Sequence, residues 1–227
     1  IEKKGDSLIG RKIKELDITN LWVDYLKEKK DCYTYDLMDI ARIKVSKELE
    51  LRNSSSNITK KMRSYRNEYN EVNQNKIGKS NLVFQPVGTD INDVGAFSDL
   101  TRLLIKHKPY KNSETPKWNE KIDNLALNEF EKVTKKITKL SINEMDPDAI
   151  LIKWNKPISK SLKTGQVYIK FSFVHRIFGE NTYVETYYFF NKDEAIEITF
   201  MSDNPVKQKW RKIVDDAINS FSYKSRK

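Results

Sequence analysis

Apolar and polar residues alternate in four runs along the last third of the chain, and short polar breaks separate these runs. The runs span residues 150–159, 166–177, 183–190 and 195–201. Turn-forming residues occupy the breaks at 163–165, 179–181 and 191–194. Alternation with a period of two is typical of β-strands, and breaks this short cannot hold a parallel crossover. The pattern therefore predicts four strands that pair antiparallel as a meander.

Shorter runs earlier in the chain predict further strands. Residues 40–52 alternate in two pieces and predict one strand with a solvent-exposed face, and residues 81–93 pass from apolar residues into a loop rich in Pro, Gly and Asp. A third run, 100–110, is closed by Pro109, which cannot donate a ladder hydrogen bond. Together with the meander, these runs predict an antiparallel sheet of about six strands, near the usual sheet size.

Three other segments have apolar residues at spacings of three and four, which predicts helices. The first covers about 57–75, with its apolar stripe at Ile58, Met62, Tyr65, Tyr69 and Val72. The second runs from about Trp118 to Ile142, with its stripe at Ile122, Ala126, Phe130, Val133, Ile137 and Leu140. The third follows Pro205, with its stripe at Trp210, Ile213, Val214, Ala217, Ile218 and Phe221. Such a stripe is the face that a helix lays on a sheet.

The predicted strands and helices are segregated rather than alternating as βαβ units, which indicates an α+β fold. We expect a central antiparallel sheet flanked by helices. Residues 1–34 are predicted to be a peripheral N-terminal segment, helical in part because apolar residues between Ile18 and Leu26 have helical spacing. Residues 35–227 are predicted to form a single domain.

The carboxyl-terminal pattern resembles the PsbP-like (Mog/PsbP) α/β/α sandwich. The strand "AIEITF", a polar break, a helix containing Trp210 and the closing "INSFSY" carry this resemblance. The segments "IKVSKELELR", "NLVFQPVGTD" and "LTRLLIKHKPY" are similar to an uncharacterised Bacteroidetes group with that fold. The resemblance covers roughly residues 38–223. It implies a non-enzymatic bacterial protein that acts in binding or assembly, and no functional motif of the family can be matched to residues here.

The strand at 183–190 is aromatic on both faces, which bears on whether it could stack nucleic-acid bases. Tyr183, Tyr187 and Phe189 fall on one face, while Tyr188 and Phe190 fall on the other. A base-stacking sheet needs exposed aromatic residues beside basic ones. Two apolar faces instead predict a core strand that is covered on both sides.

The net charge of +10 leaves two interpretations open. Most basic residues are Lys, and a chain rich in Lys, Asn and Ile is what an AT-rich genome encodes. In that interpretation the lysines form a solvated surface and the charge has no binding role. Alternatively, the basic residues bind nucleic acid or another polyanion. The candidate surface consists of the basic faces of the predicted helices at 57–75 and 120–142. Its residues are Lys60, Lys61, Arg63, Arg66, Lys132, Lys135, Lys136 and Lys139.

No motif for catalysis or cofactor binding is found in the sequence. His107 and His175 lie among basic residues and would form a site only if they converged with a carboxylate. A single cysteine, Cys32, excludes an intramolecular disulfide and a Cys-based zinc site. Seven glycines form no phosphate-binding loop. We therefore expect no catalytic residues, no metal and no cofactor.

The leading functional prediction is a non-enzymatic binding or accessory protein whose partner is a protein or a component of the cell envelope. The first alternative is polyanion binding through the basic helix faces, and the second is an enzyme that uses His107 or His175. No apolar run reaches the ~18 residues that span a bilayer. The chain begins at Ile1 rather than Met, so the location is open. An exported protein, periplasmic or envelope-associated, that has lost an N-terminal signal is one candidate.

Overall fold

The structure is a computed structural model that describes residues 31–37, 40–51, 82–89, 101–109, 120–177, 179–191, 194–203 and 208–224. The chain divides into two compact units, one from Ile1–Lys47 with Asp216–Lys227 and the other from Glu48–Asp215. The predicted helices at 18–26 and 57–75 lie outside the described residues. The predicted limits 1–34 and 35–227 therefore stay a prediction.

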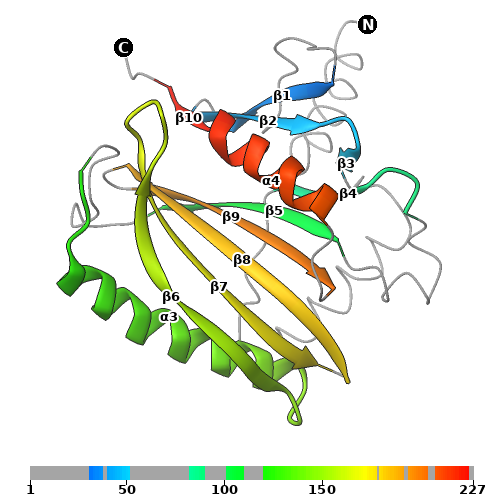
Figure 1. Cartoon of the computed structure of the whole chain (residues 1–227), viewed down its shortest axis with the longest axis vertical. Helices are drawn as coiled ribbons and strands as arrows, with labels where there is room; N and C mark the ends of the chain where they lie inside the picture. Colours follow the sequence, from blue (N-terminus) through cyan, green and yellow to red (C-terminus); the bar gives the residue numbers. More distant parts are fainter. Residues whose placement is uncertain are drawn as a thin grey trace, which may run out of the picture. The chain divides into compact units, whose positions relative to one another are not determined.

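The larger unit is built on a seven-stranded sheet in which every neighbouring pair is antiparallel (Figure 1). In spatial order the strands are β3 (Leu49–Leu51), β4 (Leu82–Pro86), β5 (Arg102–Pro109), β9 (Glu194–Asp203), β8 (Glu180–Asn191), β7 (Val167–Ile177) and β6 (Ile150–Ser161). The α+β fold with a central antiparallel sheet is confirmed, with seven strands in this sheet instead of about six. The β6–β9 meander lies where the alternating pattern predicted it.

Two tight turns in the meander depend on glycine. Between β6 and β7, the Leu162 amide donates to the Gln166 carbonyl at 2.8 Å, and the Gly165 amide donates to the Leu162 carbonyl at 2.9 Å. Gly165 has a φ of 84°, and Gly179, between β7 and β8, has a φ of 83°. Because side chains with a Cβ disfavour positive φ, these two glycines let the strands reverse within a few residues.

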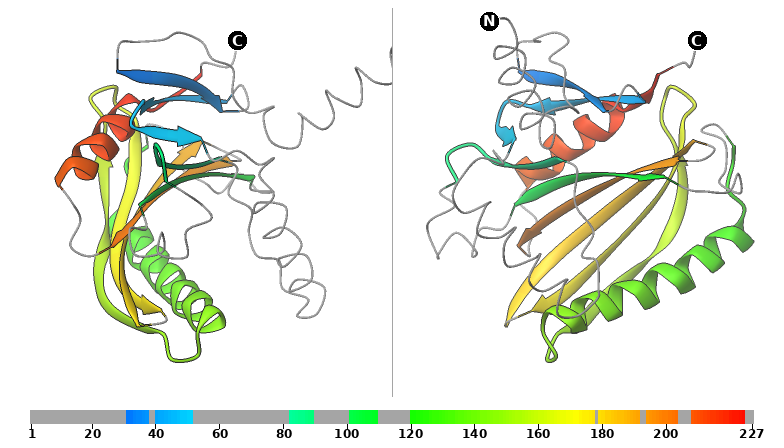
Figure 2. Two further views of the ribbon diagram at one scale, coloured as in Figure 1. Left: turned by 90° about the vertical axis from the view of Figure 1, so that its right-hand side faces the viewer. Right: turned by 180° about the vertical axis from the view of Figure 1, so that it is seen from behind.

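Helix α3 (Asn124–Met145) lies along one face of the sheet over β6 and β7, as both rotated views show (Figure 2). It begins at Asn124, later than the predicted Trp118, because the Asp123 carboxylate caps it by accepting from the Ala126 amide at 2.8 Å. Phe130 packs against the sheet, with its ring centroid 5.3 Å from that of Tyr188 and 6.0 Å from that of Phe171. This core also holds Ile122, Val167, Ile169, Phe173, Val184, Phe190 and Ala195.

The opposite face of the same sheet is also apolar. Its buried side chains include Leu103, Ile105, Tyr187, Phe189, Ile196, Ile198 and Phe200. Helix α4 (Gln208–Ser220) contributes Arg211 to this face. The prediction that β8 is covered on both sides is confirmed, since Tyr187 and Phe189 are buried on one face and Tyr188 and Phe190 on the other.

The smaller unit holds a three-stranded antiparallel sheet of β1 (Cys32–Leu37), β2 (Ala41–Ser46) and β10 (Ser222–Tyr223), with β2 in the middle. Its buried Asp36 carboxylate is paired with Arg42 Nε at 3.0 Å and Lys224 Nζ at 2.9 Å. The sequence predicted one strand over 40–52. That prediction is wrong, because a turn at residues 47–48 separates β2 from β3, which belong to different sheets.

Candidate functional site

The predicted basic surface is described only on α3. Lys60, Lys61, Arg63 and Arg66 lie outside the described residues, so whether the two basic helix faces are adjacent stays open. The other four residues, Lys132, Lys135, Lys136 and Lys139, all lie on α3. Three of these are exposed, whereas Lys135 is half-buried, with its Nζ 5.8 Å from the centroid of the Trp154 ring on β6.

The side of α3 that faces the sheet is not the predicted apolar stripe. The partly or fully buried side chains recur at Leu127, Phe130, Thr134, Thr138 and Ile142. Four members of the predicted stripe are exposed instead: Ala126, Val133 at 57%, Ile137 at 56% and Leu140 at 53%. The prediction that these four pack on the sheet is wrong.

The aromatic packing of Phe130 and the contacts of Trp154 together favour this orientation. The indole Nε1 of Trp154 donates to Glu131 Oε1 at 3.1 Å, and the Lys135 ammonium lies over the Trp154 ring in a cation–π contact. Glu131 and Lys135 are thereby held toward the sheet. Because both lie on the same side of the helix as Leu127 and Ile142, Val133 and Ile137 turn to solvent.

The result is a surface that we call the α3 outer face, consisting of Lys132, Val133, Lys136, Ile137, Lys139 and Leu140. None of its three lysines forms an ion pair with another described residue. Isolated exposed apolar residues are common on proteins. Three branched side chains on one helical stripe, beside three lysines without an ion-pair partner in the described part of the chain, form one continuous surface of apolar and basic residues.

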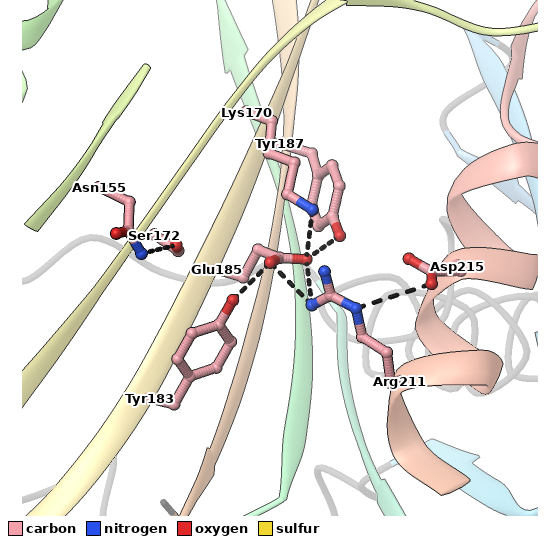
Figure 3. A network of polar contacts seen from close by, with 8 residues as sticks. All are labelled: Asn155, Lys170, Ser172, Tyr183, Glu185, Tyr187, Arg211 and Asp215. Atoms are coloured by element: carbon pink, nitrogen blue, oxygen red, sulfur yellow. Dashed lines mark hydrogen bonds and ion pairs between the residues drawn. The ribbon is translucent and has the colours of Figure 1, made fainter. Parts of the chain in front are cut away.

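A dense polar network surrounds the Glu185 carboxylate on β8 (Figure 3). Glu185 is 1% exposed and accepts hydrogen bonds from the hydroxyls of Tyr183 and Tyr187. Arg211 Nη1 lies 2.8 and 2.7 Å from its two oxygens, and Lys170 Nζ lies 3.2 Å from Oε1. Two cations and two phenols therefore surround one carboxylate.

The protonation states in this network are fixed by those contacts. Burial alone would raise the pKa of Glu185, but the hydrogen bonds from Tyr183, Tyr187 and Arg211 and the charge of Lys170 outweigh it and hold the pKa below its usual value. Burial, reinforced by the Glu185 charge, raises the pKa of Tyr187. An ionised carboxylate with its lone pairs occupied is a poor base, and a neutral phenol is a poor nucleophile. The network holds α4 to β7 and β8.

A second buried carboxylate, Glu197 on β9, lies on the α3 side of the sheet. Tyr188 donates to its Oε2 at 2.7 Å, and the ammonium groups of Lys106 and Lys108 pair with its two oxygens. Burial alone would raise the pKa of Glu197, but the charges of Lys108 and Lys106 and the hydrogen bonds from Lys108 and Tyr188 hold it below its usual value. This cluster joins β5 to β9 and β8.

The two histidines do not converge. His107 on β5 and His175 on β7 are separated by two strands and, by the register of the sheet, point to opposite faces. His107 Nε2 lies 3.3 Å from Glu194 Oε2. His175 is buried, its Nδ1 has no hydrogen-bond partner among the described residues, and burial lowers its pKa. In the part of the chain that the structure describes, no group of three or more metal-ligating side chains gathers.

The sequence pattern could have located the Glu185 network in part. Glu185 alternates with Tyr183 and Tyr187, so all three share one face of a strand whose faces are otherwise apolar. A carboxylate in that position requires partners. Lys170 lies on the neighbouring strand β7 and Arg211 on α4, 26 residues after Glu185, and only the folded structure identifies both as its partners. Among the described residues, no helix is long and apolar enough to cross a membrane.

Comparisons with known proteins support the fold. No protein family profile matches the chain, and no curated protein matches it. The solution structure of cyanobacterial PsbP (CyanoP) from Synechocystis sp. PCC 6803 matches with a TM-score of 0.50 and 11% identity, over 90% of this chain and 99% of that one.

A crystal structure from Bacteroides thetaiotaomicron VPI-5482 matches with a TM-score of 0.37 and 9% identity, over 82% of this chain and 46% of that one. This second similarity is too low to support the predicted Bacteroidetes origin. The first shows a shared fold and no more. The chain thus has an α+β fold that resembles that of cyanobacterial PsbP.

Proposed function

We propose that this chain is a non-enzymatic binding or accessory protein, and that its partner contacts the α3 outer face. The observation that carries the proposal is the orientation of α3, which leaves Val133, Ile137 and Leu140 more than half exposed. A helix packed on a sheet ordinarily buries its apolar stripe. This helix buries Leu127, Phe130 and Ile142 but leaves a second apolar stripe toward solvent.

The size of the apolar stripe indicates what kind of interaction it supports. Full burial of an aliphatic side chain contributes about 1.5–3 kcal/mol, so covering the exposed half of three side chains contributes roughly 2–4 kcal/mol. Association itself costs at least about 4 kcal/mol. The stripe is therefore insufficient alone, and a stable contact requires the adjacent lysines as well. The PsbP-like fold is compatible with this role, because the resemblance implies proteins that bind or assemble.

Site-specific photo-crosslinking tests this proposal. A benzophenone amino acid would replace Ile137 on α3 or, as the matched control, Ile158 on β6, which is 45% exposed and lies on the opposite face of the sheet. Both variants would be irradiated in cells of the source organism. We expect a discrete cross-linked species from position 137 and none from position 158. Equal products at both positions, or none at either, would contradict the proposal.

A second candidate function is polyanion binding, favoured by the row of exposed lysines Lys132, Lys136 and Lys139. Phosphate contacts make binding fall steeply with salt, whereas a contact that includes the apolar stripe retains affinity. Labelled oligonucleotides titrated at two salt concentrations therefore separate the two functions.

A further inference from the structure

The α3 outer face has the spacing of a helix–helix seam. Val133, Ile137 and Leu140 are separated by four and three residues, the alternation that coiled-coil core positions follow. Lys136 immediately flanks this stripe, while Lys132 and Lys139 lie further round the helix on the same side. Another helix laid along the stripe would therefore present one of its flanks to the lysines.

We propose that the α3 outer face binds an acidic amphipathic helix of a partner protein. The apolar side of that helix covers Val133, Ile137 and Leu140, and its carboxylates face Lys132, Lys136 and Lys139. This inference rests on the proposed function and specifies its partner class. Exposed Glu129 and Glu144 bound the stripe at its two ends. The acidic residues of the partner helix are therefore expected near its middle, where they avoid these two carboxylates.

A second copy of this chain fits the surface less well. A symmetric pair of α3 helices would place the same residues against each other. Lys136 would then approach the lysines of the other copy, and like charges across an interface oppose association. An acidic helix replaces this repulsion with attraction to ammonium groups that lack a partner among the described residues.

A lipid surface also fits less well. Helices that lie in a membrane interface carry Trp, Phe or Leu residues on the face that enters the lipid, whereas the α3 outer face carries a single one, Leu140. The aromatic residues near this helix are instead packed inward, where Phe130 contacts Phe171 and the Trp154 ring stacks 5.7 Å from Phe173. Glu129 and Glu144 would in addition face the anionic headgroups that the lysines would attract.

Two labelled synthetic peptides of about three heptads test the inference. Both peptides have Leu at the core positions. They differ at the flanking positions of the middle heptad, which are Glu in the acidic peptide and Lys in the basic peptide. Fluorescence anisotropy would measure their binding to the full chain at about 0.05 and 0.15 M salt. The variants are I137D, K136E and the control K156E, which reverses the charge of an exposed lysine on β6.

We expect the acidic peptide to bind roughly tenfold or more tightly than the basic one. I137D should lose roughly tenfold or more in affinity, K136E should reduce the preference for the acidic peptide, and K156E should behave as the unchanged chain. Equal affinity for both peptides, or equal losses in K136E and K156E, would overturn the inference. The inference would also be overturned if the chain bound phosphatidylglycerol vesicles but not the acidic peptide, and if I137D abolished the vesicle binding. A specific cross-link at position 137 without preference for the acidic peptide would leave the proposed function standing and remove only this partner class.

Discussion

Replacing Glu185 with Gln tests whether the buried network holds the fold together. The substitution keeps the shape of the side chain but removes its charge and turns one acceptor oxygen into a donor NH2 group. That group then faces donors on Tyr183, Tyr187, Arg211 or Lys170, all of which now contact the carboxylate. At least one buried donor loses its acceptor.

The contacts set the size of the effect. Each hydrogen bond to a charged group is worth about 1.5–3 kcal/mol, and two cations lose their counter-ion. Arg211 is 35% exposed, so solvent screening reduces its share. We expect a loss of about 2–4 kcal/mol, equivalent to a fall in Tm of roughly 5–12 °C for a chain of this size. The control is E180Q, an exposed glutamate on the same strand, which should change stability by less than about 0.5 kcal/mol.

Urea unfolding followed by circular dichroism measures both variants. The pH dependence gives an independent readout. Because the pKa of Glu185 is lowered in the folded state, its contribution is present above the ordinary value of 4.5 and is lost as pH falls through the folded-state pKa. The difference between the unchanged chain and E185Q should therefore narrow below about pH 4.5. An E185Q variant as stable as E180Q at neutral pH would refute the assignment of a stabilising role to this network.

Four further predictions follow from other parts of the structure. Phe130→Ala should destabilise by roughly 2–4 kcal/mol and Ile137→Ala by less than about 0.5 kcal/mol; the reverse order in urea unfolding would show that α3 faces the other way. Burial lowers the pKa of His175, so the unfolded chain takes up this proton first and stability should fall as pH drops below 6.5. His175→Phe should flatten unfolding free energies measured between about pH 7.5 and 5.5, and an unchanged slope would remove His175 as the cause. Gly165→Ala should cost about 1 kcal/mol because its φ is positive, and Gly165→Asn should cost less; equal melting temperatures for both and the unchanged chain would contradict this. Oligonucleotide binding should be lost at about 0.15 M salt; binding that persists there, and that the triple variant K132E/K136E/K139E abolishes, would favour the polyanion function.

The meander was predictable because its information is local. Alternation over 150–201 marks each strand, and Gly165 and Gly179 mark two of the turns, so strand order and direction follow from neighbouring residues. The short strands β1 and β10 were not predicted. Strand β10 has two residues and pairs with β2, far away in the sequence, so no periodic pattern can reveal it.

The orientation of α3 was not predictable by counting apolar residues. The stripe through Phe130, Val133 and Ile137 is regular, yet only Phe130 contacts the sheet. Further contacts come from Trp154 on β6, which holds polar Glu131 and Lys135 on the same side of the helix. The Trp154 contacts and the packing of Leu127 and Phe130 together select one side of α3, and the other apolar stripe becomes the surface on which the proposed function rests.

The yield of cross-linked product at Ile137 relative to Ile158 tests the central claim most directly. Both are isoleucines of similar exposure in the same unit, so they differ mainly in the face on which they lie. If the α3 outer face binds the partner, a discrete product should form at Ile137 in cells, and either V133D or L140D should abolish that product. Equal yields at the two positions, or a product at Ile137 that survives both V133D and L140D, would contradict the account.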